Sequence, residues 1–159
     1  MTSEHITAAL SVAVRPDHLQ PVIMERLDIP KALERQIKAK QCYRNAVIVA
    51  AGLSESSAVV LGVTVLPAGI GIEHCWVKME NGQHFDPTFQ TLFESEEEVD
   101  GSKYYAMLEI PVTEYSDLAE QLHVGKRAIC FADIRRSKLY RHLFIRNHQE
   151  RSELLKIVS

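Results

Sequence analysis

Cys42, His74 and Asp86 are the residues of this chain whose types and spacing fit a thiol catalytic site. A carboxylate that hydrogen-bonds an imidazole fixes the orientation of the ring and favours its cationic form. A cysteine at the start of a helix lies at the positive end of the helix dipole, and a nearby imidazolium further favours the thiolate. If the fold brings the three side chains together, they predict nucleophilic attack on a carbonyl group.

The register of one hairpin decides whether His74 can meet Asp86, and its sequence reads IEHCWVKMENGQHFDPT. With a two-residue Asn-Gly turn, the two side chains would point to opposite faces of the sheet. With a three-residue loop over 80–82, in which Gly82 is left-handed, Trp76 lies opposite Asp86 and His74 is its diagonal neighbour on the same face.

Polarity favours the three-residue loop. In that register the apolar residues of the hairpin share one face, which we expect to be the core face: Cys75, Val77, Met79 and Phe85. The polar residues and the indole then share the other face: His74, Trp76, His84 and Asp86. A carboxylate within reach of an imidazole is therefore the predicted arrangement.

The hairpin resembles the His-x-Trp and Asp-Pro-Thr strand pair of transglutaminase-like domains, and QCYRNA upstream is similar to their nucleophile segment. The resemblance covers about residues 36–90. It implies an α+β fold of the papain-like and transglutaminase-like kind, in which an antiparallel sheet packs against an N-terminal nucleophile helix and extra helices follow. It also implies that Cys42 is the nucleophile, His74 the general acid and base, and Asp86 the group that holds the imidazole.

Further residues near the nucleophile are candidates for binding the substrate or its oxyanion. Under the resemblance, the backbone amide of Cys42 is one oxyanion donor. Gln36 lies six residues earlier, the interval at which papain-like enzymes place a glutamine, and Gln41 is an equally simple candidate. Asn45 can bind substrate or cap a neighbouring loop, and Trp76 is a wall of the site or part of the core. No glycine directly precedes Cys42 to make the turn that exposes the sulfur.

The site needs a helix for the thiol and strands for the other two groups. The pattern predicts helix over about 30–40 and over 42–51, as two helices or one, with Gly52 as a left-handed cap. It predicts strands over 58–66, 70–79, 83–86 and 104–110, and helices over 113–123 and about 131–156. We expect a single domain over 1–159, made of an N-terminal arm or short helices (1–29), a catalytic core (30–112) and a C-terminal helical part (113–159).

Composition narrows the class of protein. A chain of 159 residues that is 46% hydrophobic and 25% charged fits one domain with a packed core. A net charge of −3 gives no general attraction to nucleic acid or to a membrane surface. No stretch approaches the roughly 18 apolar residues of a membrane span. Three cysteines, an odd number, predict reduced thiols and a cytoplasmic protein, with Cys75 and Cys130 inert.

Other interpretations compete with the thiol site. A set of two histidines and one carboxylate can hold a divalent metal, and His74, His84 and Asp86 form such a set. The thiol chemistry itself needs no cofactor and no metal. The acidic residues of 94–100 predict a solvated loop, and the basic segment 126–146 predicts a solvated helix face or a contact with that loop rather than a nucleic-acid site.

The sequence thus predicts a thiol-dependent hydrolase or acyltransferase that acts on an amide or ester carbonyl through a thioester. The expected substrate is a peptide, a protein or a small amide. The alternative is a binding or regulatory protein that keeps the fold without chemistry. For a catalytic site, we expect the Cys42 sulfur within about 4 Å of a His74 ring nitrogen.

Overall fold

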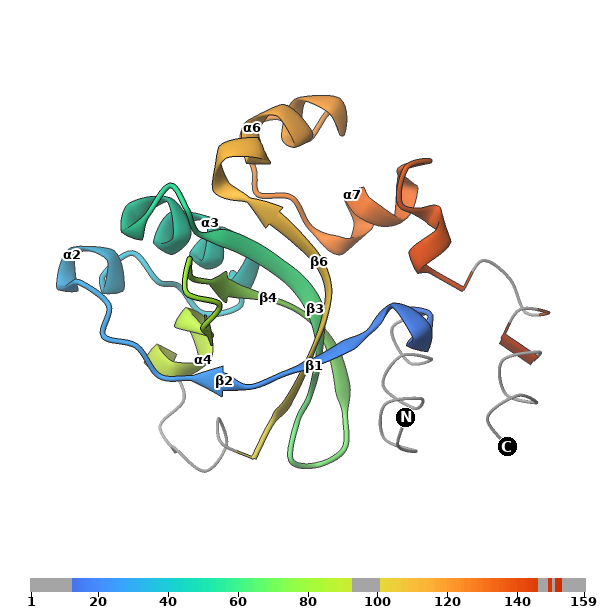
Figure 1. The fold of residues 1–159 in the computed structure, drawn as a ribbon, viewed down its shortest axis with the longest axis horizontal. Coiled ribbons are helices and arrows are strands. Elements are labelled where there is room, and N and C mark those ends of the chain that lie inside the picture. Colours follow the sequence, from blue (N-terminus) through green and yellow to red (C-terminus); the bar gives the residue numbers. More distant parts are fainter. Residues whose placement is uncertain (1–12, 93–100, 146–148, 150, 153–159) are drawn as a thin grey trace.

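A curled sheet of six strands forms the centre of the protein (Figure 1). The computed structural model describes residues 13–92, 101–145, 149 and 151–152. The strands are β1 (Gln20–Val22), β2 (Met24–Glu25), β3 (Ala58–Val65), β4 (Gly71–Lys78), β5 (His84–Phe85) and β6 (Lys103–Pro111). They lie in the order β1-β6-β3-β4-β5-β2, and every neighbouring pair is antiparallel except β2 and β5. The architecture is therefore α+β, as predicted.

Two short N-terminal strands occupy the opposite edges of this sheet. β1 pairs with β6 and β2 pairs with β5, although only Ile23 separates them in the chain. The sheet must curl to bring its two edges that close. Residues 20–25, which the prediction placed in an arm or short helices, thus form edge strands, and η1 (Pro16–His18) is a short helix in the described part of this segment. Pro21, which suggested a break, is tolerated because β1 is an edge strand.

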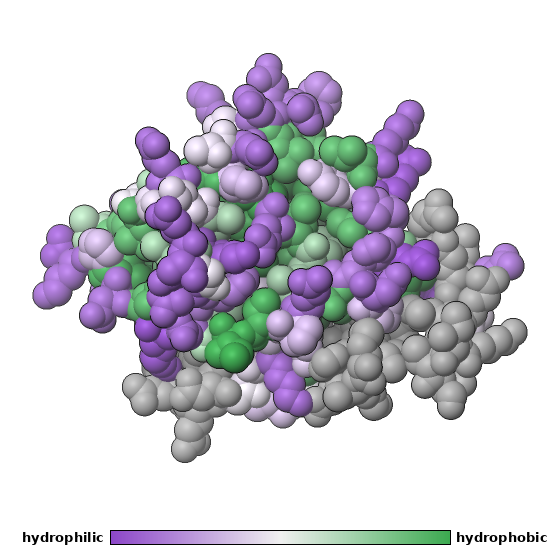
Figure 2. All heavy atoms as spheres, in the orientation of Figure 1, coloured by the Kyte–Doolittle hydropathy of each residue, from purple (hydrophilic) through white to green (hydrophobic). Residues whose placement is uncertain are grey.

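Helices pack around the curled sheet. They are α2 (Lys31–Glu34), α3 (Cys42–Leu53), α4 (Pro87–Leu92), α6 (Val112–Gln121), α7 (Phe131–Arg136) and the short η2 (Arg141–Leu143). The larger core lies between one sheet face and α3, α6 and α7, where Val49 and Ile134 pack with Cys75 and Val77. Figure 2 shows that hydrophilic residues dominate the face in view and that apolar patches lie between them.

A second core lies on the other face of the sheet, inside the curl. Its buried members are Val60, Trp76, Phe89, Tyr104 and Ala106. The two cores explain why β3 is buried on both faces and reads as a continuous apolar run. The predicted division of the hairpin into two faces is confirmed, but the face that carries the polar residues is also buried.

The helices differ more from their predictions than the strands do. The predicted segment 30–40 is helical only over α2, and α3 is a separate helix that continues to Leu53. Gly52 lies inside the last turn and is not left-handed, because the backbone exits at Ser54 in an extended conformation. The predicted strands over 58–66, 70–79 and 104–110 and the helix over 113–123 are confirmed within one or two residues at each end.

The helix predicted over 131–156 is not continuous, because residues 137–145 interrupt it. α7 ends at Arg136, Ser137 is extended, and η2 follows after a turn. The chain turns there because Phe144 is buried in the larger core and bridges to Val14 of the N-terminal segment. The acidic loop predicted over 94–100 lies outside the described residues. In the part of the chain that the structure describes, no helix has the length and apolar character needed to cross a bilayer.

Gly62 of β3 should be intolerant of any side chain. A Cβ atom there would lie 2.3 Å from the ring of Trp76 and 2.3 Å from the carbonyl oxygen of Tyr105. We expect Gly62→Ala to lower the free energy of unfolding by about 3 kcal/mol or more in urea denaturation, because neither the indole nor the backbone can give way. Gly69→Ala is the control: it meets no atom within 4 Å and carries only the strain of a positive φ, about 1 kcal/mol. Equal losses would contradict this packing.

Candidate active site

His74 and Asp86 form a buried pair, as the hairpin register predicted. Val77 pairs with Phe85, and Gly82 has a φ of 88° in the three-residue loop. This register places Asp86 diagonally from His74. His74 Nε2 lies 2.6 Å from Asp86 Oδ2, and both residues are at most 2% exposed. The predicted three-residue loop is confirmed, and the two-residue turn is excluded.

Asp86 is the centre of a larger hydrogen-bond network. Its Oδ2 also accepts a hydrogen bond of 2.7 Å from the hydroxyl of Tyr104. Its Oδ1 accepts a bond of 3.0 Å from the backbone N–H of Phe89, so the carboxylate also caps the start of α4. With both oxygens bonded, the carboxylate is held in one orientation. Tyr104 comes from β6 and reaches Asp86 through the interior of the curled sheet, and the sequence did not indicate it.

The surroundings of His74 favour its cationic form. Burial lowers the pKa of the imidazole, but the negative charge and hydrogen bond of Asp86 raise it more, and the net pKa is about 10. The Cys42 side chain lies close enough to add to this rise through hydrogen bonding and charge. Because Asp86 occupies Nε2, Nδ1 is the ring nitrogen left for the thiol. The ring also stacks on Phe89, with centroids 4.3 Å apart.

Cys42 begins α3 directly after a sharp turn. Gln41 is the N-cap residue, and Lys40 before it has a φ of 61°. The chain thus makes the turn with a left-handed lysine, in place of the glycine whose absence the sequence had indicated. The first hydrogen bond within α3 runs from Asn45 N to the Gln41 carbonyl. The backbone N–H of Cys42 is therefore not used by the helix, and it can stabilise an oxyanion.

Asn45 fixes this turn from inside the protein. Its Oδ1 accepts a bond from Lys38 N at 3.0 Å, and its Nδ2 donates to the Lys38 carbonyl at 2.8 Å and to Thr88 Oγ1 at 2.9 Å. The side chain is buried and its donors and its acceptor are engaged in these bonds. The expectation that Asn45 binds substrate is not supported, and its role is to position the start of α3 against α4.

The two candidate glutamines lie at the surface. The Gln36 amide donates to the Ala32 carbonyl at 3.3 Å, so its side chain points back along the chain and not toward Cys42. Gln41 is exposed and lines a groove beside α3. Of the two, Gln41 is the one whose position next to the thiol fits a contact with substrate.

Trp76 and His84 support the site from inside the curl. Trp76 is fully buried, so it is a wall of the site and does not contact a substrate. Its Nε1 donates to His84 Nδ1 at 2.9 Å. Burial lowers the pKa of His84, and the charge of Lys78 lowers it further. In the described ranges, no three side chains of the His, Cys, Asp or Glu types are grouped to hold a metal ion. The metal set of His74, His84 and Asp86 is therefore not supported.

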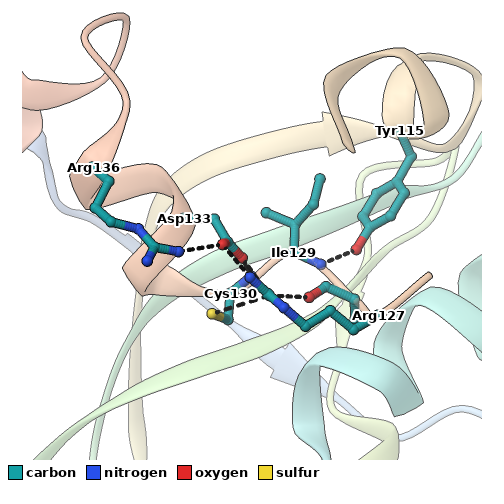
Figure 3. Close-up of polar contacts among 7 residues, drawn as sticks. Tyr115, Arg127, Ile129, Cys130, Asp133 and Arg136 are labelled. Atoms are coloured by element: carbon teal, nitrogen blue, oxygen red, sulfur yellow. Dashed lines mark hydrogen bonds and ion pairs between the residues drawn. The ribbon is translucent and has the colours of Figure 1, made fainter. Parts of the chain in front are cut away.

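The other two cysteines have different surroundings. Cys75 is completely buried on the core face, and burial together with the charges of Cys42 and Asp86 raises the pKa of its thiol. Cys130 is half-buried at the start of α7, with its sulfur 3.7 Å from Arg127 Nη1 (Figure 3). Since all three thiols are free, none is removed from chemistry by a disulfide.

The helix α7 contacts both elements that carry the site. Tyr43, next to Cys42, packs against the core cluster that contains Phe131 of α7. Arg135 forms an ion pair with Glu73, next to His74. α7 thus braces α3 against β4, and the segment predicted only as an extra helical part helps to hold the site together.

Comparison with known proteins gives no independent support for a family. No protein-family model, no curated protein and no solved structure matches the chain. The resemblance to transglutaminase-like domains therefore stays a prediction carried by residues 36–90. The function is therefore inferred from the geometry of the site.

Tyr104→Phe should reveal how much the hydrogen-bond network around Asp86 contributes to the stability of the fold. The variant removes one buried hydrogen bond to a carboxylate and keeps the ring that packs against Trp76. We expect it to lower the free energy of unfolding by about 1–3 kcal/mol. Tyr140→Phe is the control, because in the described chain its hydroxyl makes no hydrogen bond, and it should change stability by less than about 0.5 kcal/mol. A loss no larger than that of the control would contradict the network.

Asp86→Asn should make His74 neutral at pH 7. In the wild type, the contact between protonated His74 and Asp86 stabilises the fold. Its full contribution is present below pH 6.5, the ordinary pKa of histidine, and it is lost as the pH rises through about 10, the pKa of His74 in the folded protein. Without the charge of Asp86, burial dominates and the pKa of His74 should fall below its ordinary value. Nuclear magnetic resonance of the imidazole protons across pH measures this, with His84, whose pKa is lowered, as the internal reference. A wild-type His74 that titrates near 6.5 would contradict the ion pair.

Proposed function

We propose that the protein is a thiol-dependent hydrolase or acyltransferase in which Cys42 attacks an amide or ester carbonyl. The observation that carries the proposal is the buried His74–Asp86 pair beside the start of α3, which carries Cys42. Asp86 takes Nε2 at 2.6 Å, and the Cys42 side chain acts on the same imidazole. A papain-like or transglutaminase-like fold agrees with this order of helix, strand and strand and is proposed with it.

The first half of the reaction forms a thioester. The Cys42 thiolate attacks the carbonyl carbon, and the carbonyl oxygen becomes an oxyanion that the backbone N–H of Cys42 stabilises. When the tetrahedral intermediate collapses, the bond from carbon to the leaving amine or alcohol breaks. The leaving group takes the proton of the His74 imidazolium, so the imidazole becomes neutral. Asp86 keeps the ring in place while the imidazolium becomes neutral and, later, when it is protonated again.

The second half releases the acyl group. Neutral His74 removes a proton from a water molecule or an amine, and the resulting nucleophile attacks the thioester carbon. The thiolate leaves, and the imidazolium and thiolate are restored together. Water gives hydrolysis or deamidation, and an amine gives acyl transfer. Neither half of the proposed reaction needs a cofactor.

We propose a peptidase or amidase as the first choice within this class, with acyl transfer as the second. A peptide, a protein or a small amide supplies the carbonyl group. Three free cysteines agree with a reducing compartment, which favours the cytoplasm. If Cys42 proves unreactive, the remaining proposal is a binding or regulatory protein that keeps the fold.

Alkylation by iodoacetamide tests the proposal. We expect Cys42 to react about tenfold faster than Cys130 or more, and Cys75 to react slowest, because a thiolate beside an imidazolium is the better nucleophile. Peptide mass spectrometry over time gives the three rates at neutral pH. Cys130 is the matched control, since both thiols are half-buried. The advantage of Cys42 should disappear in His74→Ala. Equal, slow labelling of all three thiols would exclude the catalytic proposal.

A further inference from the structure

A groove of about 1030 Å³ runs between α3, α6 and the segment before α7. Gln41, the residue that precedes Cys42, is among the residues that line it. Its apolar walls include Val47 and Ile48 of α3 and Tyr115 of α6. Neither the thiol, the imidazole nor the carboxylate of the site lines it. The groove is therefore a surface beside the site that can hold the part of a substrate next to the reacting bond.

Positive charge is concentrated around this groove. Arg44, Lys126 and Arg127 line it, against the single carboxylate of Glu120. Arg44 donates to the backbone carbonyl of Gln36 at 2.8 Å, which leaves its charge uncompensated. Within the described ranges, neither Arg44 nor Lys126 forms an ion pair. The chain as a whole carries a net charge of −3, so this positive surface is local.

The wall opposite α3 is held in a fixed shape (Figure 3). The two terminal nitrogens of Arg127 bond both oxygens of Asp133, at 2.7 and 2.5 Å. Arg136 bonds the same carboxylate at 2.9 Å, so two guanidiniums share one negative charge and a positive charge remains. The hydroxyl of Tyr115 accepts a bond of 2.7 Å from Ile129 N, which ties this wall to α6. A preformed wall lowers the entropy cost of binding.

We infer that the groove binds an acidic peptide segment of the substrate and brings the adjoining carbonyl group to Cys42. Carboxylate side chains complement the charges of Arg44 and Lys126, and apolar side chains fit the surface of Val47 and Ile48. An open groove of this size suits an extended peptide better than a small amide. A basic peptide would meet like charges, which gives selectivity by repulsion. The inference rests on the proposed function for its substrate role.

Binding can be measured without turnover in the Cys42→Ala protein. The probe is a fluorescein-labelled peptide of alternating Leu and Glu, and the matched probe carries Gln in place of Glu. By fluorescence anisotropy we expect the acidic peptide to bind about tenfold more tightly or better. Arg44→Glu combined with Lys126→Glu should weaken its binding by about tenfold or more. Lys31→Glu with Lys138→Glu makes the same change in net charge at two exposed lysines outside the groove and should change affinity less than about twofold.

The possible results of these experiments test the binding inference and the proposed function separately. Equal affinity for the two peptides, or no loss in the Arg44 and Lys126 double variant, would overturn the inference. Tight binding of tripolyphosphate without binding of the acidic peptide would overturn it in favour of a small polyanion. Peptide binding with an unreactive Cys42 contradicts only the proposed function, and a reactive Cys42 without binding contradicts only the inference.

Discussion

The buried contact between His74 and Asp86 is the constraint on which the rest of the site depends. Two ionisable groups are almost completely removed from water here, and such a pair is stable only when its remaining hydrogen-bonding atoms are also satisfied. Tyr104 and the start of α4 meet that requirement for the carboxylate. The network therefore favours a charged imidazole inside an apolar core, and Asp86 engages only one of the two ring nitrogens.

The curl of the sheet encloses the contact between His74 and Asp86. The curled sheet gives the protein an interior face in addition to the core under α3, and the polar network lies on that interior face with Trp76 and Phe89. The start of α3 reaches the same place because Asn45 ties it to the preceding turn and to α4. α7 then braces α3 and β4 from outside. Segments from distant parts of the chain thus converge on one imidazole.

The sequence predicted the elements whose structure is determined by residues close together in the chain. The hairpin loop and its register followed from alternation of polarity and from Gly82, and the strands followed from runs of valine and leucine. Tyr104 was not predictable in this way, because a bulge between Leu108 and Ala106 of β6 shifts the alternation and turns Tyr104 toward Asp86. The edge strands have two and three residues and pair with strands far along the chain, so no local signal marks them. The break before Cys42 depends on tertiary bonds of Asn45 and on a left-handed lysine, which composition does not reveal.

The central claim is that the thiol of Cys42 exchanges a proton with the imidazole of His74. A crystal structure of the protein tests it most directly, through the distance between Cys42 Sγ and His74 Nδ1. We expect these two atoms to lie within about 4 Å of each other. A sulfur that points away from the imidazole, or a Nδ1 that is hydrogen-bonded to another group, would contradict it.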